Sequence, residues 1–302
     1  PQDVFSVSLG IIVCNGPGPL KAALAGARPW VDELVVVDTG SEDQTVEIAA
    51  RFGARIHRFP WCDDFSAARN ESLRHAHGRW LFWMDSDDTI DEENGRKLQA
   101  LARQAAGEAP MAYDMQVHCP GTDEYDVTAV DHVKMFRNLP DIRFEGRIHE
   151  QVLPSIRRLG GEVAWSDVFV VHSGSDQTPE GRLKKYERDL RILRLEIEEK
   201  PDHPFVLFNL GMTYGDMGNH EEAVRWLRRT LEVAAVSESH VRKAYALLVH
   251  SLSQLGRIGE AWHVCCDGLG HFPQDTELLF RKGVLAQGTQ RWEEAIGSYR
   301  AA

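Results

Sequence analysis

Two carboxylates follow an apolar run in the stretch "WLFWMDSDD". Asp85 and Asp87 are two residues apart, so in an extended segment their side chains point the same way. Like charges this close repel each other, and a divalent cation bound between them removes the repulsion. Sites built from oxygen ligands suit Mg²⁺ or Mn²⁺. The spacing therefore predicts a metal site that also binds a diphosphate.

A second interpretation assigns the acids to a helix start. Asp88 or Thr89 would cap a helix in "IDEENGRKLQALARQ", and acidic residues in its first turn would favour the positive end of its dipole. This interpretation explains the later acids well and Asp85 poorly. We expect both, on different residues: metal and diphosphate binding at Asp85 and Asp87, and capping at Asp88 or Thr89.

Short apolar runs alternate with amphipathic stretches from about residue 5 to residue 173. The runs "FSVSLGIIV", "ELVVVD", "ARIHRF" and "WLFWM" are typical of strands, with helical stretches between them. We expect Ser41 to cap the second helix. The β-α-β-α-β-α-β order predicts a doubly wound α/β sheet. Ligands of such sheets bind beyond the carboxyl ends of the strands, where Asp38 and Asp85 are expected.

After about residue 178 the pattern becomes helical and repeats. Gly211, Val249 and Gly283 are equivalent in three similar segments, as are Ala223, Ala261 and Ala295. The intervals of 38 and 34 residues are near the period of tetratricopeptide repeats, and small residues let paired helices approach closely. We predict a sheet domain at 1–177, a linker helix at 178–203 and repeats at 204–302, the last one short or truncated.

Composition narrows the classes of function. The chain of 302 residues is 43% hydrophobic and has a formal net charge of −12, so it has no excess basic charge for binding nucleic acid. Its five cysteines follow neither a metal-ligand spacing nor an even framework, which fits a reducing compartment. No run approaches the roughly 20 apolar residues of a transmembrane segment. We expect a cytoplasmic protein.

Four segments in order carry a resemblance to a known family. "SLGIIVCN", "VDELVVVDTGSEDQTVEIAARFGA", "WCDDFSAARNESLRHAHGRWLFWMDSDD" and "FRNLPDIRFEGRIHEQVLP" together resemble a family 2 glycosyltransferase with the GT-A fold. More narrowly, the chain resembles the bacterial subgroup with C-terminal tetratricopeptide repeats. The resemblance implies a hexosyltransferase-like enzyme that transfers a sugar from a nucleotide-sugar donor, usually a UDP-sugar, with inversion at the anomeric carbon.

The resemblance also implies roles for individual residues. "MDSDD" matches the family's D-x-D motif, so Asp87 would ligate Mn²⁺ or Mg²⁺, and Asp85 would contact the ribose or the metal shell. For Arg69, neutralising phosphate and pairing with a nearby acid are equal alternatives. The nucleotide-sugar contacts implied besides Asp85 are Asn15, Asp38, Arg69 and Ser86.

The chain departs from the family pattern at two places. Asp38 is followed by Thr39, where many members have a second aspartate; the repeat-bearing subgroup commonly shows this Asp-Thr-Gly. The loop "CNGPGP" after the first strand lacks the charged residues usual in the subgroup.

An inverting transfer needs a general base, and "FEGRIHEQV" supplies candidates. Its "HE" matches the subgroup's motif, which implies Glu150 as the base and Glu145 as the second candidate, with His149 orienting the base or contacting phosphate. The alternative is a salt-bridged loop in which Arg143 and Arg147 pair with the two glutamates.

His172 ends the apolar strand expected in "VFVVHSG". A lone histidine at a strand end is commonly structural. In the GT-A fold, however, a histidine after the last core strand often completes the metal site, and imidazole suits Mn²⁺. We expect His172 to join Asp85 and Asp87 as a metal ligand.

Two other functions stay open. The altered "CNGPGP" loop is compatible with a peptide- or protein-binding repeat scaffold that carries a degenerate sugar-nucleotide domain. A nucleotidyltransferase would need a phosphate loop rich in glycine and lysine, which "CNGPGPLK" matches poorly. The repeats suit a peptide or protein acceptor or a homodimer, and a cell-surface glycan acceptor is equally compatible with the sequence.

Overall fold

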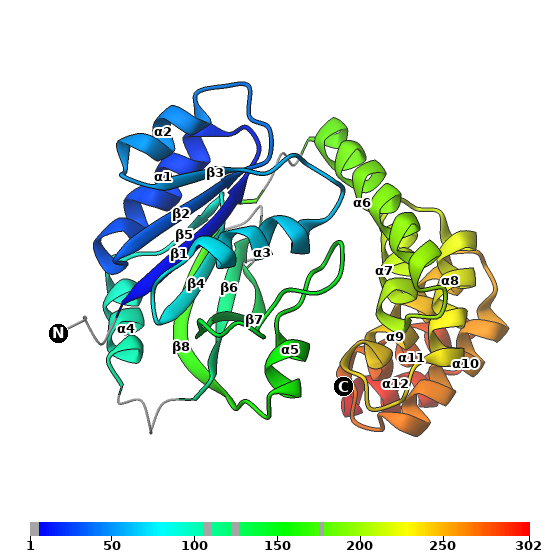
Figure 1. Ribbon diagram of the computed structural model, residues 1–302. Helices are drawn as coiled ribbons and strands as arrows, with labels where there is room; N and C mark the ends of the chain where they lie inside the picture. Colours follow the sequence, from blue (N-terminus) through cyan, green and yellow to red (C-terminus); the bar gives the residue numbers. More distant parts are fainter. Residues whose placement is uncertain (1–5, 105–109, 122–126, 175–177) are drawn as a thin grey trace. The chain divides into compact units, whose positions relative to one another are not determined.

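The computed structural model describes residues 6–104, 110–121, 127–174 and 178–302. The chain separates into two compact units, Pro1–Gln177 and Thr178–Ala302. The first unit is a sheet flanked by helices, and the second consists of helices (Figure 1). The predicted fold class, an α/β domain followed by an all-α repeat region, is confirmed.

One half of the sheet is parallel and follows the predicted order of elements. These are β1 (Val7–Val13), α1 (Pro17–Ala27), the short 3-10 helix η1 (Arg28–Trp30), β2 (Glu33–Asp38), α2 (Thr45–Arg51), β3 (Arg55–Arg58), α3 (Phe65–His75) and β4 (Trp80–Asp85). β1 lies between β2 and β4, and its last residues pair with Asp38 on one side and Asp85 on the other. The two acids therefore flank the carboxyl end of one strand.

The other half of the sheet continues from β4 through mixed pairing. Its strands are β7 (Val127–Arg137), β6 (Ala112–Pro120), β8 (Val163–His172) and β5 (Asp88–Thr89), in that order outward from β4. The helices α4 (Glu92–Ala102) and α5 (Leu153–Arg158) belong to the same unit. β5 runs antiparallel to β8, which places Asp88 directly opposite His172.

β4 is buried on both faces of the sheet. Its alternating side chains enter two separate cores: Trp80, Phe82 and Met84 pack in one, and Leu81 and Trp83 in the other. Because successive side chains of a strand point to opposite faces, burial on both faces requires a continuous apolar run. The strand that ends in Asp85 is thus held by packing from both sides.

The predicted cap of α4 is wrong. Asp91, rather than Asp88 or Thr89, caps the helix, and its side chain accepts a hydrogen bond from the Asn94 backbone nitrogen at 2.8 Å. Asp88 and Thr89 are instead paired with β8 as strand β5, so the helix begins two or three residues later than expected.

The second unit contains the predicted repeats. A long helix α6 (Pro179–Glu199) precedes three helical hairpins, which are α7 (Pro204–Asp216) with α8 (His220–Val233), α9 (Ser239–Gln254) with α10 (Ile258–His271), and α11 (Thr276–Gly288) with α12 (Trp292–Ala301). A Cβ added at Gly211 would lie 2.6 Å from Leu227, and one at Gly283 would lie 2.5 Å from Tyr299. Close approach of paired helices therefore requires glycine at both positions.

Candidate active site

Arg69 joins the end of β4 to the loop before α5. It lies on α3 and is 5% exposed. Its Nη2 donates to Asp85 Oδ1 at 2.5 Å, and its Nε donates to Glu150. Burial lowers the pKa of Arg69, but the two carboxylates raise it more, so the net shift is upward. Of the two roles expected for Arg69, the structure shows the pairing with nearby acids.

Asp85 is held in its ionised form. Burial raises the pKa of its carboxyl, but the charges of Arg69 and Lys134 lower it by more, so the pKa lies well below its usual range. A carboxylate that stays ionised over a wide pH range remains available to a divalent cation. This electrostatic environment fits the predicted role of Asp85.

Asp88 is the most connected acid of the site. It is fully buried and pairs with Lys134, whose side chain is 1% exposed and whose Nζ lies 2.7 Å from Oδ2. Oδ2 also accepts from the Asp85 backbone nitrogen at 2.9 Å, and Oδ1 lies 2.8 Å from Nδ1 of His172. Burial raises the pKa of Asp88, but Lys134 and His172 outweigh it and lower the pKa.

Ser86 and Asp87 form the turn between β4 and β5. The Asp87 carbonyl accepts from the backbone nitrogen and the hydroxyl of Ser173, at 3.0 and 2.9 Å. Its carboxylate lies 3.6 Å from His172 Nδ1, and among the described residues no lysine or arginine pairs with it. Burial raises the pKa of Asp87, with the neighbouring acids acting in the same direction. Such a carboxylate gains most from an added cation.

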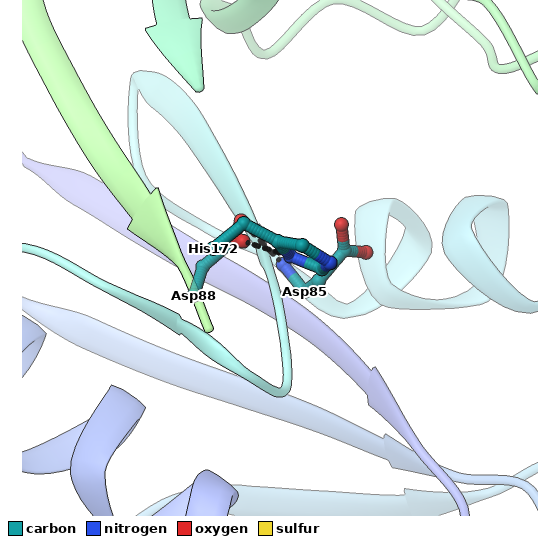
Figure 2. A group of neighbouring side chains, drawn as sticks. All are labelled: Asp85, Asp88 and His172. Carbon is teal, nitrogen blue, oxygen red and sulfur yellow. Dashed lines mark hydrogen bonds and ion pairs between the residues drawn. The ribbon is translucent and has the colours of Figure 1, made fainter. Parts of the chain in front are cut away.

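The carboxylates and the imidazole converge closely enough for one ion. Asp85, Asp88 and His172 each offer a ligand atom, and these atoms lie within 4.8 Å of one another. Figure 2 shows the interactions from Asp88 to His172 and to the Asp85 backbone. The expected ligands were Asp85, Asp87 and His172; the structure brings Asp88 into this group and leaves Asp87 at its edge. Carboxylate oxygens with one imidazole suit Mn²⁺.

The loop between β7 and α5 contains the predicted general base. The side chain of Glu150 is 10% exposed and pairs with Arg69. Glu145 is 40% exposed and pairs with Arg158. Glu150 therefore belongs to the buried network at the end of β4, whereas Glu145 lies on its exposed margin.

The alternative in which Arg143 and Arg147 pair with these glutamates is wrong, because the glutamates pair with Arg69 and Arg158 instead. Nη1 of Arg143 donates to the preceding carbonyl at 2.7 Å, and Nη1 of Arg147 donates to the Asp63 carbonyl at 3.4 Å. His149 has a φ of 54°, in the left-handed region that residues other than glycine rarely adopt. The backbone is strained directly before Glu150, as is common at functional sites.

Contacts with α3 explain why Glu150 faces Arg69. The side chain of Asn70 donates to the Phe144 carbonyl at 3.0 Å and accepts from the Phe144 nitrogen at 2.9 Å. The Phe65 nitrogen donates to the Arg147 carbonyl at 2.7 Å. Asn70 thus binds the loop backbone while the adjacent Arg69 binds the loop's carboxylate.

The loops after β1 and β2 are joined by hydrogen bonds. Asn15, with a φ of 56°, accepts from the Glu42 nitrogen at 3.0 Å, and its own nitrogen donates to the Ser41 hydroxyl at 2.9 Å. The Ser41 nitrogen donates to Asp38 Oδ1 at 3.0 Å. Ser41 therefore bridges Asn15 and Asp38. Its predicted role as the cap of α2 is wrong, because that helix begins at Thr45.

Lys134 is a site residue that the sequence analysis missed. Its signal was a lysine inside the apolar segment "VKMF", where a charged side chain requires a partner. Its neighbour Trp83 was counted as core, yet Lys134 Nζ lies 3.7 Å and Arg69 Cζ lies 4.2 Å from the centre of the Trp83 ring. Both cations of the site are thus packed against one aromatic residue.

Comparison with known proteins agrees with this fold. Residues 8–143 match the family model for glycosyl transferase family 2, and residues 206–236 match that of the tetratricopeptide repeat. The chain therefore contains a family 2 glycosyltransferase domain followed by tetratricopeptide repeats.

Two curated relatives are similar to this chain. A TPR repeat-containing protein of Synechococcus elongatus is 32% identical over 81% of this chain and 60% of its own length. The SPbeta prophage-derived glycosyltransferase SunS of Bacillus subtilis is 26% identical over 76% of this chain and 54% of its own length. The chain thus spans a little over half the length of these relatives.

Within the described residues, no helix is both long enough and apolar enough to cross a bilayer.

Proposed function

We propose that this chain is an inverting, metal-dependent glycosyltransferase that takes a sugar from a nucleotide-sugar donor, with a UDP-sugar as the first candidate. The observation that carries the proposal is the convergence of acids and His172 at the carboxyl end of β4. The acids Asp85, Asp87 and Asp88 lie within the segment that matches the family 2 model. Asp85, Asp87 and His172 would hold Mn²⁺ or Mg²⁺. A bound divalent ion would neutralise the diphosphate leaving group.

The nucleotide would bind along the carboxyl edge of the parallel strands. Asn15 and Asp38 are linked through Ser41 at the ends of β1 and β2. Arg69 and Ser86 lie at the β4 end of the same edge. These four residues are the proposed nucleotide-sugar contacts, together with Asp85. Ligands of open α/β sheets bind at this edge, which supports the assignment.

Glu150 is the proposed general base, with Glu145 as the second candidate. It would remove the proton of the acceptor nucleophile as that group attacks the anomeric carbon from the face opposite the leaving diphosphate. Its contact with Arg69, which also binds Asp85, supports a place for Glu150 close to the donor. Glu145 pairs with Arg158 at the exposed margin, which makes it the weaker candidate. His149 would orient the base.

The acceptor is proposed by class only. Tetratricopeptide repeats suit binding of an extended peptide or protein, so we favour a peptide or protein acceptor over a cell-surface glycan. The same repeats would equally support a homodimer. Size-exclusion chromatography with light scattering would measure the mass of the chain in solution, and a monomer at all concentrations would remove the homodimer from consideration.

Release of the nucleoside diphosphate from a panel of UDP-, GDP- and TDP-sugars, without acceptor, tests the enzymatic function. We expect slow, Mn²⁺-dependent hydrolysis of at least one donor. Asp87→Asn should lower this rate by about 100-fold, because it removes a proposed ligand of the metal ion that would neutralise the leaving diphosphate. Glu93→Gln is the matched control, since Glu93 is an acid at an exposed site on α4. No release with any UDP-, GDP- or TDP-sugar would favour a binding scaffold with a degenerate domain.

A further inference from the structure

Asp88 is buried among donors rather than open to a ligand. Its side chain is fully buried, and three polar groups contact its two oxygens. Lys134 and the Asp85 backbone nitrogen share Oδ2 at 2.7 and 2.9 Å, while Nδ1 of His172 lies 2.8 Å from Oδ1. The neighbouring Asp87, by contrast, has its carboxylate 3.6 Å from the same nitrogen and has no lysine or arginine partner among the described residues.

The lysine that pairs with this acid lies at a β-bulge. In the ladder between β6 and β7, Tyr113 pairs with Met135 and Asp114 pairs with Val133, so Lys134 has no opposite residue on β6. Strand alternation places Lys134 on the same face of β7 as Phe136, where it lies against Trp83 and reaches Asp88.

We propose that Asp88 is a positioning residue, held by Lys134, that orients His172 for metal binding and does not itself bind the metal. This inference rests on the proposed metal-dependent function. The Nδ1–H of His172 would donate to Asp88, which sets the tautomer and directs Nε2 to the ion. Metal-binding histidines commonly donate their second ring N–H to a carboxylate in this way.

The contacts of Asp88 favour this role over direct ligation. An ion bound to Asp88 would lie close to the Lys134 ammonium, which is 2.7 Å from the same carboxylate, and the two cations would repel each other. Asp85 also pairs with a cation, Arg69, but through Oδ1 alone and with a side chain that is 36% exposed. Asp87 has neither a lysine nor an arginine partner among the described residues. The proposal thus assigns Asp85, Asp87 and His172 as ligands and places Asp88 and Lys134 behind them.

A double-mutant cycle separates a positioning residue from a ligand. Mn²⁺ affinity is measured by electron paramagnetic resonance of free Mn²⁺, with and without UDP, in the wild type, Asp88→Asn, His172→Ala and the double variant. If Asp88 acts through His172, Asp88→Asn weakens Mn²⁺ binding by about 10- to 100-fold when His172 is present. In the His172→Ala background the same substitution has almost no effect. Asp91→Asn, an acid outside the network, is the control.

An equal loss of affinity in both backgrounds would show that Asp88 is a ligand and would overturn the proposal. So would full affinity in Asp88→Asn. Absence of Mn²⁺ binding by the wild type would overturn this inference and the metal-dependent function together, whereas Mn²⁺ binding and donor hydrolysis with an additive cycle would overturn this inference alone.

Nitrogen-15 NMR of the histidines supplies a second readout that needs no metal. We expect the wild-type His172 ring to carry its proton on Nδ1, and Asp88→Ala to shift it toward the Nε2–H tautomer. An unchanged tautomer would contradict the proposal.

Asp88→Asn or Asp88→Ala would leave Lys134 without its partner, and the variant could then fold poorly. In that case, Asp88→Asn is combined with Lys134→Met, which removes both buried charges. This double variant is expected to fold normally and still to bind Mn²⁺ weakly, and wild-type affinity in it would refute the inference.

Discussion

Replacing Arg69 by methionine should destabilise the first unit strongly. The substitution keeps much of the apolar contact with Trp83 but leaves two carboxylates without their cation. Removing one partner of a buried ion pair costs about 3–5 kcal/mol. Glu150, with a side chain 10% exposed, would bear most of this cost, whereas the side chain of Asp85 is 36% exposed and water would offset its share. We therefore expect a loss of about 3 kcal/mol.

Unfolding monitored by tryptophan fluorescence would measure this loss, since Trp83 lies beside Arg69. For a unit of this size, about 3 kcal/mol corresponds to a fall in melting temperature of about 6–12 °C. Arg74→Met is the matched control: it lies on the same helix, is 69% exposed, and pairs only on the surface with Glu71, so it should cost less than about 0.5 kcal/mol. Equal melting temperatures for Arg69→Met and Arg74→Met would refute the view that Arg69 holds this network together.

Two further predictions concern stability. Burial raises the pKa of Glu33, but hydrogen bonds from His77, Ser8 and Arg55 outweigh it and lower the pKa to about 2. Because the folded-state pKa of Glu33 lies below its unfolded-state pKa, Glu33 stabilises the fold above about pH 4.5. This contribution, up to about 3 kcal/mol, is lost as the pH falls toward 2. In Glu33→Gln, the free energy of unfolding in urea should therefore depend less steeply on pH between about pH 5 and about pH 3, and a slope equal to that of the wild type would contradict this. In the repeats, Gly211→Ala places a Cβ 2.6 Å from Leu227 and should cost about 1–3 kcal/mol in thermal unfolding. Gly215→Ala, whose Cβ would lie 3.8 Å from the Ala223 Cβ on α8, should cost nothing, and equal effects of the two substitutions would refute the packing argument.

Local patterns in the sequence predicted the framework of the site well. The uninterrupted apolar run of β4 indicated a strand buried on both faces, and its alternating residues indeed enter two cores. The position of Asp85 at the end of that strand followed directly. The alternation of Tyr113, Met115 and Val117 with polar residues would have identified β6, which was overlooked. Each of these signals lies within a few consecutive residues.

Partners distant in the sequence were not predictable in the same way. Glu150 pairs with Arg69 from α3, 81 residues earlier, rather than with the nearby Arg147, because Asn70 holds the loop backbone against α3. Lys134 reaches Asp88 from a strand that follows it by 46 residues in the sequence. No local spacing contains that information. The ion pair between Lys134 and Asp88 also explains why the prediction of Asp88 as a helix cap was wrong.

The charges of the site suggest why two cations are buried beside four acids. Arg69 pairs with Asp85 and Glu150, and Lys134 pairs with Asp88, while Asp87 has no lysine or arginine partner among the described residues. With His172 neutral, this leaves two negative charges uncompensated, which is the charge of one divalent ion. Arg69 and Lys134 both pack against the ring of Trp83 while they pair with the other three acids. The buried cations thus stabilise the acids around Asp87 and leave the Asp87 carboxylate, in the half-buried turn between β4 and β5, for the metal.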